Sequence, residues 1–163
     1  MSRRDLKRQA KKRRARLRRA ARRALMRRVQ EEHSLEEIRL GPSADGVKMS
    51  EVLEEFVEPY GEFAETKEAY HRLLTVATLA WNASLLPRND PMANPDELVR
   101  TLPADVRGMA ADMIRQLMLR KEELFPQQRR MIIDFDLASL GTGWHLTVVS
   151  TPDAVPTAPN PPP

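Results

Sequence analysis

Charge divides the chain into two parts, and this division limits which residues can share a folded core. Residues 1–48 contain 17 lysines and arginines and 6 acidic residues, a net charge of +11. Residues 49–163 contain 10 lysines and arginines and 17 acidic residues, a net charge of −7. Because like charges oppose compaction, we expect residues 1–48 to be a basic arm that is disordered or a fraying helix, attached to an acidic folded domain.

The arm is most basic over residues 3–28, where 15 lysines and arginines accompany one acidic residue. Its few apolar residues (Leu6, Leu17, Leu25, Met26 and Val29) are not expected to form a stripe wide enough to dock on a core. Without an aromatic residue it has no platform on which bases could stack. The arm is therefore predicted to contact the phosphate backbone of RNA or DNA without sequence preference. The candidate residues are Lys11, Lys12, Arg13, Arg14, Arg18, Arg19, Arg22 and Arg23.

A second interpretation of the arm stays open beside the first. Met49 is followed directly by Ser50 and Glu51, which is typical of a natural start, and a folded pattern begins there. On this interpretation, residues 1–48 are an upstream extension translated from an earlier start codon. The turn-rich stretch 41–48 is then either a linker or a segment without a structural role.

The acidic part is predicted to be mostly helical. Apolar residues recur at helical spacing over 50–58, over 66–86 and from 103 to about 124, and a short helix is expected between residues 95 and 102. Ser50, Thr66 and Asn94 are the expected N-caps. On the second helix, Asn82 is expected to be a buried asparagine that is hydrogen-bonded to a neighbouring segment.

The pattern changes near the C-terminus from a helical period to a strand period. Residues 131–137 and 144–148 alternate, with a glycine-rich turn between them, which predicts an antiparallel hairpin. We expect Ile133, Phe135 and Leu137 to share one face, and Trp144, Leu146 and Val148 to share the matching face. The predicted fold class is α+β and mostly helical: a small helical bundle over residues 49–151 with a C-terminal antiparallel β-hairpin packed on it. Residues 152–163 are proline-rich and expected to be a disordered tail.

Four segments of the acidic part, in this order and spacing, resemble a family of small bacterial proteins of unknown activity. They are Ala80–Pro87 (AWNASLLP), Arg120–Pro126 (RKEELFP), Arg130–Phe135 (RMIIDF) and His145–Ser150 (HLTVVS). The resemblance covers roughly residues 49–151. It implies a bacterial, cytoplasmic protein whose chain begins near Met49, and it implies no activity.

Several chemistries are excluded or disfavoured. The chain has no cysteine, so thiolate zinc sites and cysteine nucleophiles are excluded, and no glycine lies in a phosphate-binding loop motif. The strongest chemical grouping is Asp134, Asp136 and His145, whose side chains would share one face of the hairpin and could hold a divalent cation. The competing interpretation is the ordinary polar face of an amphipathic hairpin.

Without a strong catalytic set, the first expectation is a small cytoplasmic adaptor, without a cofactor and not an enzyme, whose helical domain docks another protein. The alternative is an RNA- or DNA-associated protein that uses residues 3–28. A metal-dependent enzyme at the hairpin ranks third. No apolar run is long enough to span a membrane.

Overall fold

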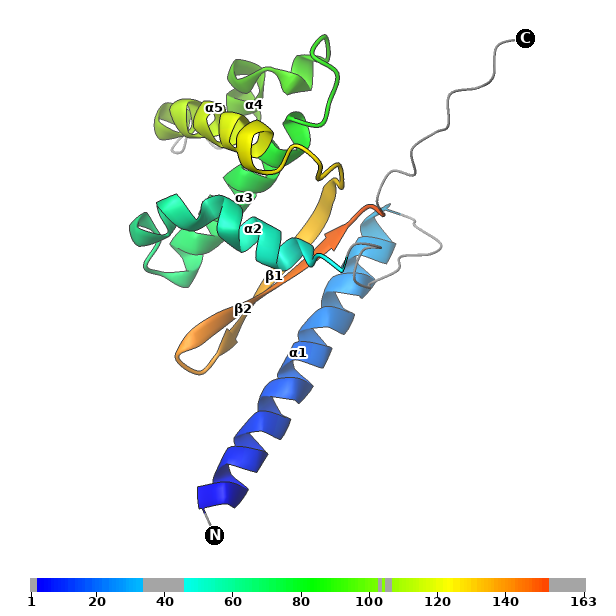
Figure 1. Ribbon diagram of the computed structural model, residues 1–163, viewed down its shortest axis with the longest axis vertical. Helices are drawn as coiled ribbons and strands as arrows, with labels where there is room; N and C mark the ends of the chain where they lie inside the picture. Colours follow the sequence, from blue (N-terminus) through cyan, green and yellow to red (C-terminus); the bar gives the residue numbers. More distant parts are fainter. Residues whose placement is uncertain (1–2, 34–45, 103, 105–106, 153–163) are drawn as a thin grey trace, which may run out of the picture.

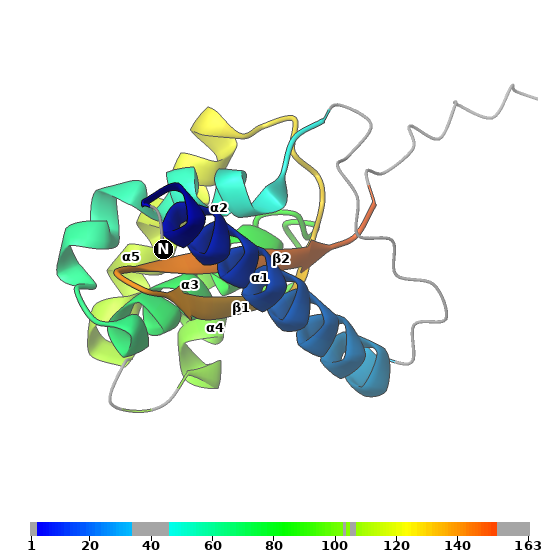
Figure 2. The ribbon, with the colours of Figure 1, turned by 90° about the horizontal axis from the view of Figure 1, so that it is seen from below.

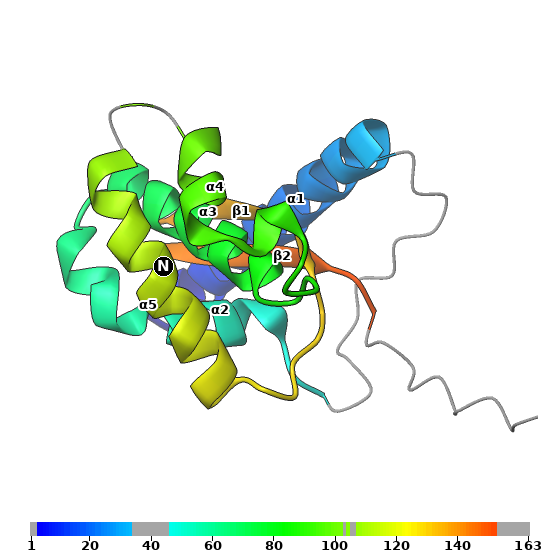
Figure 3. The same ribbon diagram turned by 90° about the horizontal axis from the view of Figure 1, so that it is seen from above.

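A two-stranded antiparallel sheet lies between two helical layers in the computed structural model, which describes residues 3–33, 46–102, 104 and 107–152 (Figure 1). The sheet consists of β1 (Ile132–Leu140) and β2 (Gly143–Ser150). On one face lie α2 (Met49–Val57), α3 (Lys67–Ala83), α4 (Pro95–Thr101) and α5 (Arg107–Leu124), and on the other lies α1 (Arg3–His33) (Figures 2 and 3). The predicted fold class, mostly helical with a C-terminal hairpin packed on the helices, is confirmed.

Two of the three expected N-cap residues, Thr66 and Asn94, cap a helix. The Thr66 hydroxyl accepts a hydrogen bond of 3.1 Å from the Ala69 N–H at the start of α3, and Asn94 Oδ1 accepts one of 2.9 Å from the Asp96 N–H at the start of α4. Ser50 is not a cap, because α2 begins one residue earlier, at Met49, after the N-cap position Lys48. Short 3₁₀ helices, η1 (Glu58–Phe63) and η2 (Pro91–Ala93), occupy two of the proline-containing connections.

Trp81 of α3 lies at the centre of the main core. Its side chain is fully buried, with the ring of Phe56 from α2 edge-on at 5.2 Å and the ring of Phe125 tilted at 5.7 Å. The indole Nε1–H donates to the Arg130 carbonyl over 2.8 Å, so the polar atom of the ring is also satisfied. One aromatic residue therefore joins α2, α3 and the segment that enters the sheet.

Two residues at the end of α5 are buried or exposed contrary to their side-chain polarity. Lys121 is only 4% exposed, whereas Leu124 is 51% exposed. The Lys121 ammonium lies 5.1 Å from the centroid of the Trp81 ring and donates to the Phe125 carbonyl over 2.8 Å. This cation satisfies a carbonyl just beyond the helix C-terminus while its aliphatic stem packs in the core, and burial lowers the pKa of Lys121.

Asn82 connects α3 to the first residue of β1. Its Nδ2 donates to the Ile132 carbonyl and its Oδ1 accepts from the Ile132 N–H, both over 2.8 Å. The side-chain amide thus pairs with both backbone groups of Ile132, as a neighbouring strand would do. The prediction that Asn82 hydrogen-bonds a neighbouring segment is confirmed, but the residue is half-buried and not fully buried as expected.

An irregularity at the start of β1 corrects the predicted strand faces. The pairing shifts between Ile132, opposite Ser150, and Asp134, opposite Val149, so Ile133 is the extra residue of a bulge. The bulge turns Ile132 into the main core, where it is 2% exposed, while Ile133 packs against α1 instead of sharing a face with Phe135 and Leu137. On β2, Leu146 is buried in the core and Val148 packs against it, and Trp144 stacks on Tyr70 at 5.4 Å, as the alternation predicts.

The hairpin closes through a two-residue loop, Gly141 and Thr142, between the paired residues Leu140 and Gly143. Gly141 has a φ of 71°, the left-handed conformation that the first residue of such a loop adopts and that glycine allows without strain. None of the helices among the described residues is long and apolar enough to cross a bilayer. Apart from Pro152, the predicted proline-rich tail lies outside the described residues, as does most of the predicted linker 41–48.

Candidate nucleic-acid interface

Most of the basic arm forms one long helix, α1. The segment Arg3–His33 contains no glycine or proline and is rich in alanine and arginine, which favour helix. Every residue from Leu6 to Ala20 is exposed, so the first half of the helix projects its cations into solvent. Such a helix has no packing on that half, and its position depends on the contacts that its second half makes.

The second half of α1 docks on the outer face of the hairpin, which the sequence interpretation did not expect. Leu25 and Val29, one helical turn apart, are 2% and 0% exposed and form a small buried cluster with Val149 of β2. Met26 and the bulge residue Ile133 pack at its edge. The expectation that the apolar residues of the arm would not dock is wrong. Leu25 and Val29 alone are enough to dock α1, because Val149 and the bulge residue Ile133 form an apolar patch opposite them.

Arg28 adds a polar contact beside this cluster. Its Nε donates to Asp134 Oδ2 over 2.8 Å, and its Nη2 donates to the Phe135 carbonyl over 3.0 Å. The hydrogen bond to Asp134 raises the pKa of Arg28. Because the Arg28 side chain is 46% exposed, the ion pair adds little energy but restricts how the helix can turn about its axis.

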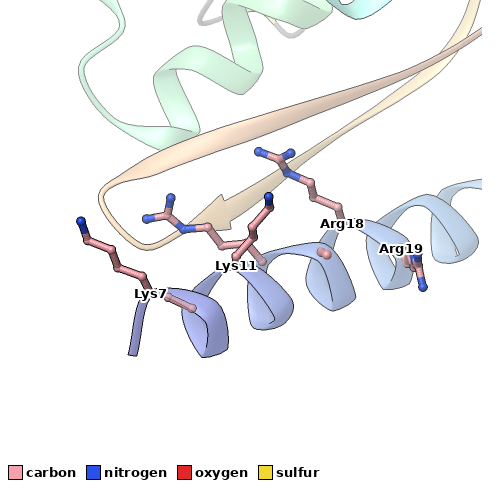
Figure 4. Close-up of a pocket in the computed structure, with 7 residues that line it drawn as sticks. Lys7, Lys11, Arg18 and Arg19 are labelled. Carbon is pink, nitrogen blue, oxygen red and sulfur yellow. The ribbon is translucent and has the colours of Figure 1, made fainter. Parts of the chain in front are cut away.

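The eight predicted nucleic-acid contacts are distributed around α1. Lys11, Arg14, Arg18 and Arg19 line a hollow of about 640 Å³ along one side of the helix, together with Lys7, Ala10 and Ala15. Figure 4 shows the side chains of Lys7, Lys11 and Arg18 extending from α1 toward the hairpin, and that of Arg19 away from it. The other four predicted residues do not line the hollow, although all are exposed: Lys12, Arg13, Arg22 and Arg23.

Electrostatics connects Arg18 to the hairpin. The pKa of His145 on β2 is lowered, first by burial of the imidazole and second by the positive charge of Arg18. Both effects disfavour the charged form of the His145 imidazole. The basic face of α1 and the outer face of the hairpin therefore lie within electrostatic reach of each other.

The three predicted metal ligands share the outer face of the hairpin, but the structure does not group them. Asp134 lies opposite Val149, Asp136 opposite Thr147 and His145 opposite Ala138, so the imidazole is displaced along the sheet from both carboxylates. Asp134 is already paired with Arg28. Among the described residues, no three histidine, cysteine or acidic side chains are placed to hold a metal ion. This arrangement gives the metal hypothesis no support.

A comparison with models of protein families, with curated proteins and with solved structures found no match to this chain. The resemblance to a bacterial family therefore stays a prediction.

Sequence reasoning found the cations of α1 but missed the residues that position them. The missed residues are Leu25, Arg28 and Val29. The sequence does contain a signal for docking here, because Leu25 and Val29 are an apolar pair at four-residue spacing near the end of the most basic segment. The partner half of the contact, Val149 and Ile133, could not be recognised, because it depends on the bulge in β1.

Proposed function

We propose that this protein binds double-stranded nucleic acid without sequence preference, through contacts between the cations of α1 and backbone phosphates. The observation that carries the proposal is the presentation of the arm as a helix attached to a folded domain. Residues 6–20 of this helix are all exposed, and its second half is held by Leu25 and Val29. A preorganised set of cations loses less conformational freedom on binding than a disordered arm does.

Charge density supports a double helix as the partner. Residues 3–28 carry 15 cations over a helix of roughly 39 Å, one for every ~2.6 Å, at a rise of about 1.5 Å per residue. Duplex DNA carries one negative charge for every ~1.7 Å of its axis. Only the cations on one side of α1 can contact a single duplex, so the total charge measures the attraction of the helix for a polyanion and not the number of phosphate contacts. α1 contains no aromatic side chain on which the bases of a single strand could stack.

The first expectation from the sequence, docking of a protein partner through the helical domain, stays a prediction. No feature of the described residues favours a particular protein partner. The exposed helix of positive charge, by contrast, specifies the chemistry of what it binds, and for this reason the nucleic-acid function ranks first.

The test is a titration of the full chain with a labelled 20-base-pair duplex at 50 and 200 mM salt. The affinity is expected to fall steeply with salt, because each phosphate that the protein neutralises releases a counterion. Replacing Arg14, Arg18 and Arg23 with glutamine should reduce the dependence of log K on log salt by about 1 for each phosphate that is no longer neutralised.

The matched control replaces three exposed arginines of the acidic domain, Arg72, Arg88 and Arg129, with glutamine and changes the net charge equally. The control should retain the affinity and the salt dependence of the unmodified chain. Equal effects in the two variants, or binding that does not respond to salt, would refute the proposed function. A single strand bound as tightly as the duplex would refute the choice of duplex.

A further inference from the structure

We propose that the duplex binds on the side of α1 that faces the hairpin, where one backbone strand lies along Lys7, Lys11, Arg14 and Arg18, here named the inward stripe. The cations on the opposite side of the helix then make no phosphate contacts. This inference rests on the proposed function and names the surface that performs it. All four residues of the inward stripe line the same hollow of about 640 Å³.

The anchor of α1 determines where the inward stripe points. The stripe has steps of four, three and four residues, and steps of seven and four lead from Arg18 to Leu25 and Val29, which keeps all six residues on one helix face. Because Leu25 and Val29 are packed on the hairpin, the inward stripe must face the hairpin side as well. Figure 4 shows Lys7, Lys11 and Arg18 in this orientation.

The electrostatic surroundings of the inward stripe favour an anion there. None of its four cations forms an ion pair with another described side chain. Residues 137–152 of the hairpin contain no lysine, arginine, aspartate or glutamate, so this part of the facing sheet offers no carboxylate to neutralise them. All residues that line the hollow belong to α1, so its positive charges lie together without an acidic side chain among them and attract a counter-charge.

The length of the inward stripe suits one backbone strand. From Lys7 to Arg18 the helix advances about 16 Å at ~1.5 Å per residue, and one strand of a duplex places a phosphate at every ~3.4 Å along the axis. The four cations therefore span roughly five phosphates. Cations on the far side of a helix about 10 Å across lie beyond the screening length of ~8 Å at physiological salt.

The decisive experiment compares two full-length variants that each carry four fewer positive charges. The inward variant carries Lys7→Gln, Lys11→Gln, Arg14→Gln and Arg18→Gln. The outward variant carries glutamine at four exposed positions of α1 that do not line the hollow: Lys12, Arg13, Arg16 and Arg23.

Neutralisation of four phosphates accounts for a fall in affinity of about 150-fold between 50 and 200 mM salt, at a slope of roughly −0.9 per phosphate. The inward variant should lack this component of the salt dependence, and the outward variant should retain it. Equal effects of the two variants would overturn the inward assignment and leave the proposed function standing. Failure of the unmodified chain to bind duplex would overturn both.

The His145 imidazole supplies a second readout in the unmodified chain, which does not depend on any variant folding. The positive charge of Arg18 contributes to the lowered pKa of His145, so a phosphate placed against Arg18 should raise that pKa. The measurement is an NMR titration of the imidazole with and without saturating duplex. A pKa of His145 that stays the same in the complex would place the duplex on another face and overturn the inference.

Discussion

Truncating one buried leucine of α1 tests whether the helix is held by the hairpin. Leu25 is 2% exposed and Leu17 is 45% exposed, and both lie on α1. The substitutions Leu25→Ala and Leu17→Ala therefore change helix propensity equally and differ only in the packing that is removed. Only Leu25→Ala should weaken docking of α1 on the hairpin.

The expected magnitude follows from the size of the cluster. Leucine-to-alanine substitutions at buried sites cost about 2–5 kcal/mol. This cluster has only three buried residues, which can relax into the cavity left by Leu25, so the docking of α1 should weaken by about 2 kcal/mol. This energy corresponds to a rise of roughly 30-fold in the population of undocked α1. The main core shares no buried residue with this cluster, so global unfolding should change little.

The chain contains no cysteine, which allows two dyes to be attached at Arg8→Cys and Thr142→Cys, both exposed positions. Energy transfer between α1 and the hairpin tip then reports undocking, and thermal unfolding reports the core. Leu25→Ala should broaden and lengthen the distance distribution, whereas Leu17→Ala should leave it unchanged. The reasoning is refuted if the two substitutions have the same effect, or if Leu25→Ala lowers the melting temperature as much as truncation of the core residue Leu74 does.

Two further predictions concern single side chains. Asn82→Ala leaves the N–H and carbonyl of Ile132 without their partners, which should lower the free energy of unfolding in urea by ~3 kcal/mol. The control, Asn89→Ala at an exposed position, should change it by no more than about 0.5 kcal/mol. Equal changes would show that the amide pairing is unimportant. For His145, burial first and Arg18 second lower the pKa, so the unfolded chain binds the proton more readily, and stability should fall as the pH drops below ~6.5. Arg18→Gln should raise the pKa of His145 in an NMR titration, and an unchanged value would contradict the predicted interaction.

Local sequence signals predicted much of the helical layer. Thr66 and Asn94 cap α3 and α4 because a side-chain oxygen followed by free N–H groups is a local arrangement that needs no tertiary contact. The hairpin was recognisable from its alternation and its glycine turn for the same reason. Ser50 fails as a cap because the preceding residue, Met49, is buried, and the helix extends to include it.

Burial of polar residues was harder to predict, because it depends on what lies across the core. Lys121 has the charge of a surface residue, and only the neighbouring Trp81 ring and the Phe125 carbonyl make its burial favourable. Asn82 was recognisable as a hydrogen-bonding residue, but its partner, Ile132, lies 50 positions away.

The sequence by itself determined where the charge lies and which segments become helix or strand, since propensity, capping and periodicity act over a few residues. It also placed the cations in a segment without aromatic side chains, and the proposed nucleic-acid partner rests on this feature. Only the tertiary structure decided that α1 has an inward and an outward side. A bulge at Ile133 and the burial of Leu25 and Val29 against Val149 set that orientation, and these contacts join residues more than 100 positions apart.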